Sequence, residues 1–186
     1  MHMRNILVSL LFAGLCSGSV GLAQSGGVDA GLQAKATNGD LVAQIALGEK
    51  LAAGVDVPQD LKQAAELYRM AAEQGNIAGE VHLAELYRDG RGVTRDKVQA
   101  AEWYRKAAEQ GDAGAQGTLA MLYVMGQGVI QSDVEAYYWL DLAAAVQSPR
   151  QDQYAANRQN VGTRITVEEL QSVQDRVAKW KAGHPR

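Results

Sequence analysis

Two histidines and two glycine-rich segments could carry chemistry in this sequence, but their spacing fits no known site. His82 and His184 lie far apart, and neither has a second histidine or a cysteine at metal-ligand spacing. The segments Gly90–Val93 and Gly126–Val129 read GRGV and GQGV. A phosphate-binding loop needs a strand before it and a lysine and a hydroxyl residue after it, which are missing here. We therefore predict no metal and no cofactor.

Serines and carboxylates also lack a catalytic arrangement. Ser132, Ser148 and Ser172 stand outside the Gly-x-Ser-x-Gly pattern of a nucleophile elbow. Glutamates recur at a fixed distance, as in Glu66 and Glu102, and a residue that recurs with a structural period is better explained by structure. An enzyme site needs a nucleophile or metal with an orienting partner, so we predict that the protein is not an enzyme.

The elements that hold these residues repeat with a period of 36 residues. AELYRMAAEQG at Ala65–Gly75 returns as AEWYRKAAEQG at Ala101–Gly111. Three registers align without a gap, at 40–75, 76–111 and 112–147, and they share the columns Leu47/Leu83/Leu119, Gly54/Gly90/Gly126 and Val57/Val93/Val129. Such a period is typical of a solenoid, in which each unit buries its apolar face against its neighbour.

Each unit reads as two helices. Apolar spacing predicts a first helix from about Leu41 to Ala53, followed by a glycine that suits a helix C-terminus. The second helix follows a residue suited to an N-cap, with Gln or Glu three positions later as in a reciprocal capping box: Asp60/Gln63, Asp96/Gln99 and Ser132/Glu135. We predict an all-α fold, an α-solenoid of three 36-residue antiparallel helix-pair repeats, with capping helices in residues 148–186.

These units resemble the Sel-1-like repeat, a relative of the tetratricopeptide repeat. The resemblance lies in A-x-x-x-L-G-x-x-L at Ala43–Leu51, GRGV at Gly90–Val93 and A-x-x-W-Y-x-K-A-A-x-Q-G at Ala100–Gly111. The first unit departs from the pattern with Asp56 in place of the second glycine, and the third lacks the closing Q-G. The resemblance implies a right-handed superhelix that scaffolds protein–protein contacts, often in the bacterial envelope.

The resemblance to tetratricopeptide geometry also implies that the first helices line the concave side, where varying positions set specificity. The candidate partner-binding residues are Glu49, Glu85, Arg88, Asp89, Met121, Val124, Met125 and Tyr137. The groove is expected to be acidic at one end and methionine-rich at the other, because methionine adapts to varied partners. Two alternatives stay open, that the methionines pack on the cap helices and that Tyr137 contacts the cap.

The charge balance bears on the class of partner. The chain of 186 residues has a net charge of −3 and no basic stripe, so nucleic acid is not expected. We predict a protein or peptide partner of unknown identity, bound by a monomer.

Residues 1–23 have the pattern of a secretory signal peptide. Arg4 precedes the apolar run Ile6–Cys16, and Gly21 and Ala23 are small residues at −3 and −1 from a cleavage site. Cleavage would remove the only cysteine and leave no membrane span. We expect an exported, periplasmic protein with a flexible segment at 24–39; lipidation of Cys16 is the alternative.

The leading functional hypothesis is a secreted adaptor that holds a protein or peptide segment in its concave groove. One alternative is an inhibitor, such as an immunity protein or a restraint on an envelope sensor. Another is a structural component of an envelope assembly, and a cell-wall hydrolase is the enzymatic alternative.

We predict that the protein recovered from the periplasm of a Gram-negative host begins at Gln24, because signal peptidase requires the small residues at −3 and −1. Intact mass spectrometry measures this directly, and Ala23→Tyr should block the cleavage. A mature chain that keeps Cys16 with an added lipid mass would contradict the assignment.

Overall fold

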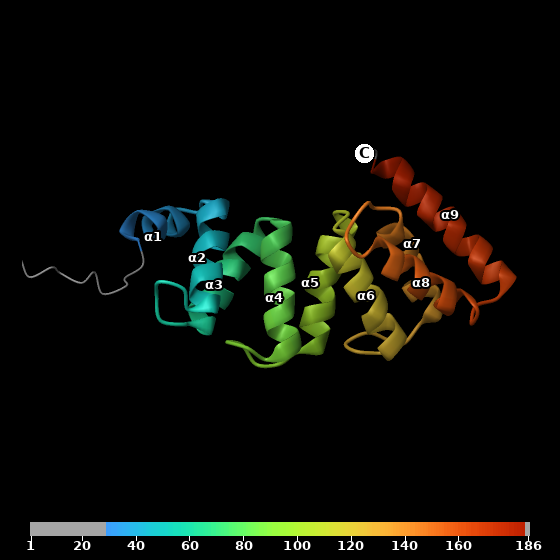
Figure 1. Cartoon of the computed structure of the whole chain (residues 1–186), viewed down its shortest axis with the longest axis horizontal. Coiled ribbons are helices and arrows are strands. Elements are labelled where there is room, and N and C mark those ends of the chain that lie inside the picture. Colours follow the sequence, from blue (N-terminus) through green and yellow to red (C-terminus); the bar gives the residue numbers. More distant parts are fainter. Residues whose placement is uncertain (1–28, 185–186) are drawn as a thin grey trace, which may run out of the picture.

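The computed structural model describes residues 29–184, which form nine α-helices joined by short loops and no β-strand (Figure 1). They are α1 (Ala30–Thr37), α2 (Leu41–Ala53), α3 (Leu61–Glu73), α4 (Ile77–Asp89), α5 (Lys97–Glu109), α6 (Ala113–Met125), α7 (Asp133–Ala144), α8 (Gln151–Gly162) and α9 (Val167–Gly183). The predicted signal peptide, with Cys16, lies outside the described residues. No helix in the described range is long and apolar enough to cross a membrane.

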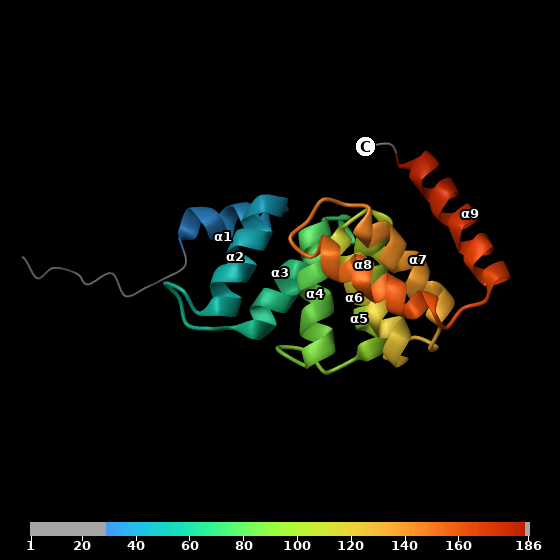
Figure 2. The same cartoon turned by 45° about the vertical axis from the view of Figure 1, so that its right-hand side comes forward.

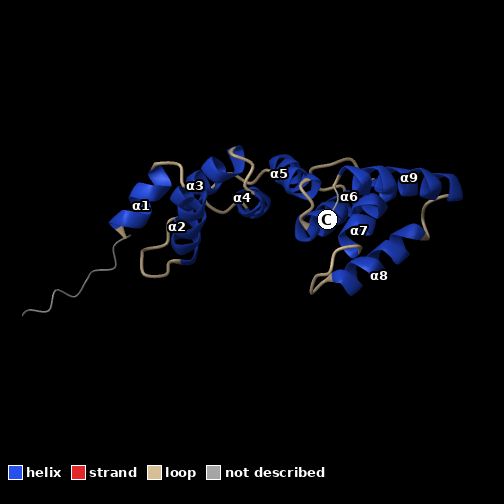
Figure 3. Ribbon diagram, turned by 90° about the horizontal axis from the view of Figure 1, so that it is seen from above, coloured by secondary structure: helices blue, strands red, loops and turns tan. Residues whose placement is uncertain are grey.

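Helices α2 to α7 form three consecutive pairs that fall within the predicted units 40–75, 76–111 and 112–147. Each helix packs on the one before it and the one after it, and α2 has its predicted bounds. Seen from above, the array is an arc whose two ends lie on the same side, with α2, α4 and α8 on the inner side (Figure 3). The α-solenoid prediction is confirmed.

Side-chain caps begin the helices of every repeat, as the sequence predicts. Asp60 and Asp96 accept hydrogen bonds from backbone N–H groups two and three residues later, and Ser132 accepts from the N–H of Glu135. The reciprocal half of the predicted capping box is not formed at these caps, since the side chain of Gln99 bonds Glu102 and that of Glu135 bonds Arg176 instead. Among the described helices, α9 alone has the complete box, between Thr166 and Glu169.

A glycine in the loop of each later unit docks against the backbone of the preceding unit. A Cβ atom added at Gly92 would collide with the carbonyl oxygen of Leu61, and one added at Gly128 with that of Lys97. Both glycines have positive φ. The first unit has Asp56 at this position, also with positive φ, and it forms an exposed ion pair with Lys50 at 2.9 Å. The glycine is needed only where a preceding repeat lies against it.

A polar side chain, at most 2% exposed, occupies the same position in each first helix: Gln44, Glu80 and Gln116. The two glutamines donate from Nε2 to the carbonyls of Ala36 at 3.1 Å and Ala108 at 3.0 Å. The carboxylate of Glu80 instead accepts from Nε2 of Gln110 at 2.8 Å. Burial raises the pKa of Glu80, while Lys106 and the bond from Gln110 oppose that rise.

Residues 30–39 differ from the flexible segment expected at 24–39. They form α1, which is capped by Asp29 and packs on α2, and Ala36 is buried there. The carbonyl of Ala36 accepts the buried side chain of Gln44, so α1 stands where the second helix of a preceding unit would stand. The sequence did not indicate this helix because the segment has few apolar residues. One alanine and one carbonyl are enough to cover Gln44, so the helix needs little apolar surface.

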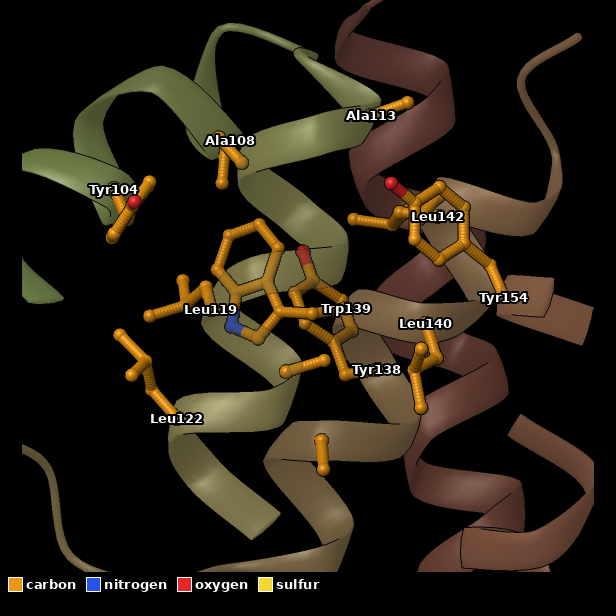
Figure 4. Close-up of a cluster of buried hydrophobic side chains, with 14 of the residues drawn as sticks. Tyr104, Ala108, Ala113, Leu119, Leu122, Tyr138, Trp139, Leu140, Leu142 and Tyr154 are labelled. Carbon is orange, nitrogen blue, oxygen red and sulfur yellow. The ribbon is translucent and has the colours of Figure 1, made fainter. Parts of the chain in front are cut away.

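The last two helices close the C-terminal end, and α9 forms the far end of the array in both side views (Figure 1, Figure 2). The core beneath them joins α6 to α7, where Leu119 and Leu122 lie beside the buried indole of Trp139 (Figure 4). Arg176 of α9 donates to both carboxylate oxygens of Glu135, at 2.7 and 2.9 Å. The predicted cap is thus attached to α7 by packing and by a bidentate ion pair.

We predict that Gly128→Ala destabilises the fold by at least about 2 kcal/mol, because the new methyl group adds a backbone collision to the cost of a left-handed conformation. Asp56→Ala is the matched control at the equivalent position, where no preceding unit is met. It should cost below about 1 kcal/mol, since it loses an exposed ion pair. Urea unfolding followed by circular dichroism measures both, and equal losses would contradict the docking role of the glycine.

Candidate partner-binding site

A pocket of about 560 Å³ lies between α4 and α6 on the inner side of the arc. One face of α4 supplies most of its wall, and α5, the start of α6 and the loop before α8 supply the rest. The lining residues are Ile77, Ala78, Val81, His82, Glu85, Arg88, Tyr104, Asp112, Gly114, Thr118 and Arg150. Of the predicted partner-binding residues, Glu85 and Arg88 line this pocket.

Arg88 is held in a fixed position at one end of the pocket. Its Nε and Nη2 atoms donate to the two carboxylate oxygens of Asp89 at 2.8 and 3.0 Å, and Nη1 donates to the hydroxyl of Tyr104 at 3.1 Å. The guanidinium holds the pKa of Asp89 below its usual range. Burial raises the pKa of Tyr104 to about 12, so this hydroxyl stays protonated. Asp89 therefore acts by positioning Arg88.

His82 joins the first two repeats at the edge of the same pocket. Its ring stacks on Tyr68, with centroids 4.7 Å apart. Nε2 lies 3.5 Å from a carboxylate oxygen of Glu49 and Nδ1 lies 3.6 Å from one of Glu85. The hydrogen bond to Glu85 raises the pKa of His82 most, against the opposing effect of burial, and both carboxylates add to the rise. Only the imidazolium form can donate from both nitrogens, so protonation links α2 to α4.

The predicted methionine-rich end of the groove lies beside α8. Met121 and Val124 line a separate cavity of about 330 Å³ whose other wall is α8, and the amide of Asn157 lies 3.9 Å from the sulfur of Met121. The ring of Tyr154 occupies the space in which a Cβ atom at Gly117 would lie. Met121 thus contacts the cap on one side and remains exposed on the other, and its role in partner binding stays a prediction.

Met125 and Tyr137 lie outside the main pocket. Met125 is half exposed at the end of α6, where its sulfur lies 3.7 Å from the amide nitrogen of Gln127. A ring carbon of Tyr137 would lie 3.0 Å from a Cβ atom at Gly162, the last residue of α8. Tyr137 is therefore a contact of the cap, the second of the two alternatives for this residue.

Most lining residues are absent from the predicted partner-binding set, among them the polar residues His82, Thr118, Tyr104 and Arg150. His82 and Thr118 could have been found from the sequence, because Ala46, His82 and Thr118 stand at one equivalent position of the first helices that varies between repeats. Tyr104 is equivalent to Tyr68 in the first repeat and is buried, so its position in the sequence indicates packing more than binding. Arg150 lies beyond the last repeat, so only the tertiary structure places it there.

The pocket lining has the mixed character of a binding site. In residues 29–184, no group of three or more His, Cys, Asp or Glu side chains is placed to hold a metal ion. The lining combines apolar side chains from the start of α4 with fixed cations and carboxylates. Such a mixture orients a ligand by a few polar contacts beside apolar ones.

The repeat pattern and fold match known proteins. Residues 41–76, 77–112 and 114–146 each match the Sel1 repeat. The fold is similar to a protective antigen of uropathogenic Escherichia coli strains that displays an SLR fold, with a TM-score of 0.71, 32% identity, and coverage of 81% of this chain and 32% of that chain. A Sel1 repeat protein from Oxalobacter formigenes has a TM-score of 0.62 and 32% identity over 70% of this chain and 96% of its own. The chain spans about a third of the antigen's length. No curated protein sequence matches the chain.

We predict that Glu85→Gln lowers the pKa of His82 more than Glu49→Gln does, because the bond to Glu85 is the largest cause of its rise. NMR titration of the imidazole carbons measures both variants. A raised folded-state pKa means that the stabilising pairs are complete below the usual value of 6.5 and are lost as the pH rises through the folded-state pKa. An unchanged His82 pKa in Glu85→Gln would contradict the pairing.

Proposed function

Because the chain belongs to the Sel1 repeat family, whose members generally mediate protein–protein contacts, we propose that it is an exported scaffold that holds a peptide segment of a partner protein in the pocket between α4 and α6. The family is a scaffold type rather than an enzyme type. The pocket of about 560 Å³ on the inner side of the arc is the observation that carries the proposal. Its lining comes largely from positions that vary between repeats, which is where a solenoid acquires specificity.

The extent of the groove follows from the two ends of the array. At the third repeat α8 borders Met121 and Val124 and narrows the groove, so the partner segment extends from the start of α6 across α4 toward α2. At the α2 end, Glu49 and Glu85 lie on either side of His82, whose imidazolium offsets one of the two negative charges, so this stretch stays acidic. The binding surface is therefore shorter than three repeats and centred on α4.

Export to the periplasm is part of the proposal, and it is supported by the signal-peptide pattern of residues 1–23. The absence of cysteine beyond that segment means that the fold depends on packing alone in an oxidising compartment.

Site-specific photo-crosslinking tests the proposal. We predict that p-benzoylphenylalanine at Ala78, an exposed lining position, forms a covalent adduct with a defined partner in the native envelope. The same group at Glu102, an exposed position of α5 outside the pocket, should form none. Adding Glu85→Arg to the Ala78 probe should reduce the adduct by roughly tenfold, equivalent to about 1.4 kcal/mol of binding energy. Equal yields at both probe positions would place the partner on another surface.

A further inference from the structure

The charged side chains that line the main pocket are satisfied within the protein, with one exception. His82 faces Glu85, Arg88 is held by the neighbouring aspartate, and Asp112 accepts the N–H of Ala115 as the cap of α6. Arg150, on the opposite wall, is exposed, and its guanidinium has no hydrogen-bond or ion-pair partner among residues 29–184. The pocket therefore contributes one unpaired positive charge toward a ligand.

A second unpaired donor lies beside Arg150. Ser148, Pro149, Tyr154 and Gly114 form a cavity of about 340 Å³ with Arg150, and Gly114 and Arg150 belong to both cavities. The Oγ atom of Ser148 is buried and has no hydrogen-bond partner in the structure. A buried hydroxyl without a partner is costly, so an acceptor that enters here would remove an existing penalty.

The start of α8 differs from the starts of the other described helices. Arg150 is its N-cap residue and supplies no side-chain cap, whereas the other described helices all begin with one. Asp152 in the first turn offsets the positive end of the helix dipole, so the inference depends on Arg150 and Ser148 and not on the dipole.

We propose that this end of the groove recognises an aspartate or glutamate side chain in the partner segment, a specificity that rests on the proposed function. Arg150 donates to the carboxylate through its fork of N–H groups and Ser148 donates from its hydroxyl. One unpaired cation matches the single charge of a carboxylate, whereas a phosphate group calls for more. Ile77 and Val81 supply the apolar wall beside it.

An internal side chain fits the site better than a chain terminus. The lining runs along α4 from Ile77 to Arg88, so the partner backbone can continue past the carboxylate in the direction of α2. Arg150 and Ser148 lie at the start of α8, at the α6 end of this lining. The partner segment is thus expected to cross the site rather than end in it.

Selection from phage-displayed random dodecapeptides, which present no free C-terminus, tests this specificity on the full exported chain. We expect the wild-type protein to enrich peptides with Asp or Glu at one fixed distance from an apolar residue. The best peptide, acetylated and amidated, is then measured by fluorescence anisotropy. Changing its acidic residue to Gln should weaken binding to the wild type at least about tenfold. In Arg150→Gln the same change should have almost no effect, because the interaction is already lost.

Arg91→Gln is the matched control, since Arg91 is an exposed arginine on the α4–α5 loop outside the pocket, and it should bind like the wild type. Melting curves establish that Arg150→Gln is folded. A peptide whose binding is lost in Ala78→Arg binds through the pocket. If such peptides show no preference for an acidic residue, or if that residue contributes equally in Arg150→Gln, this inference is overturned and the proposed function stands. Tighter binding of a peptide whose only carboxylate is its C-terminus also overturns it. Enrichment of no peptide above the bare support, or of peptides insensitive to Ala78→Arg, refutes both proposals.

Discussion

The close approach of one repeat to the backbone of the repeat before it is the constraint on which the rest of this structure depends. Gly92 and Gly128 lie against the carbonyls of Leu61 and Lys97, at distances that leave no room for a side chain. Fully buried alanines such as Ala108 let the helices pack with equal closeness. Because each unit is placed by backbone contact, these contacts fix how neighbouring units are arranged and leave the pocket beside α4 on the inner side of the arc.

The exposed faces at the two ends of the array are covered in different ways. At the N-terminal end α1 supplies one carbonyl and one buried alanine in place of a preceding unit. At the C-terminal end the contacts are reciprocal, since Tyr154 of α8 lies on Gly117 and Tyr137 of α7 lies on Gly162. Ile45 and Val81 stand at the positions equivalent to Gly117, and a side chain of either kind there would exclude the ring of Tyr154. The cap thus determines how long the groove is.

Buried polar groups also mark where the repeat pattern changes. The closing glutamine of each of the first two units donates to the buried side chain of the first helix in the same unit, as Gln74 does to Gln44 and Gln110 to Glu80. The third unit has Val146 at that position, and the Oε1 atom of Gln116 is left without a partner. The loss of that donor coincides with the departure of the chain toward α8. The third unit therefore loses the buried hydrogen bond and the helix-pair pattern at the same place, because the repeated sequence is needed for both.

The sequence by itself determined the fold class, the period, the bounds of α2 and most of the helix caps, because these depend on local spacing and on columns that recur. It also identified Glu85 and Arg88 as residues of the inner face, since they vary where the frame does not. It could not decide the extent of the groove, because whether Met121 faces a partner or α8 depends on a helix outside the repeat. It could not find Arg150 either, whose place in the pocket follows from how the loop before α8 folds back over α6. Contacts within the repeat array follow from residues that recur at a fixed spacing, so the sequence reveals them. Contacts between the repeats and the cap join segments that share no spacing, so only the folded structure reveals them.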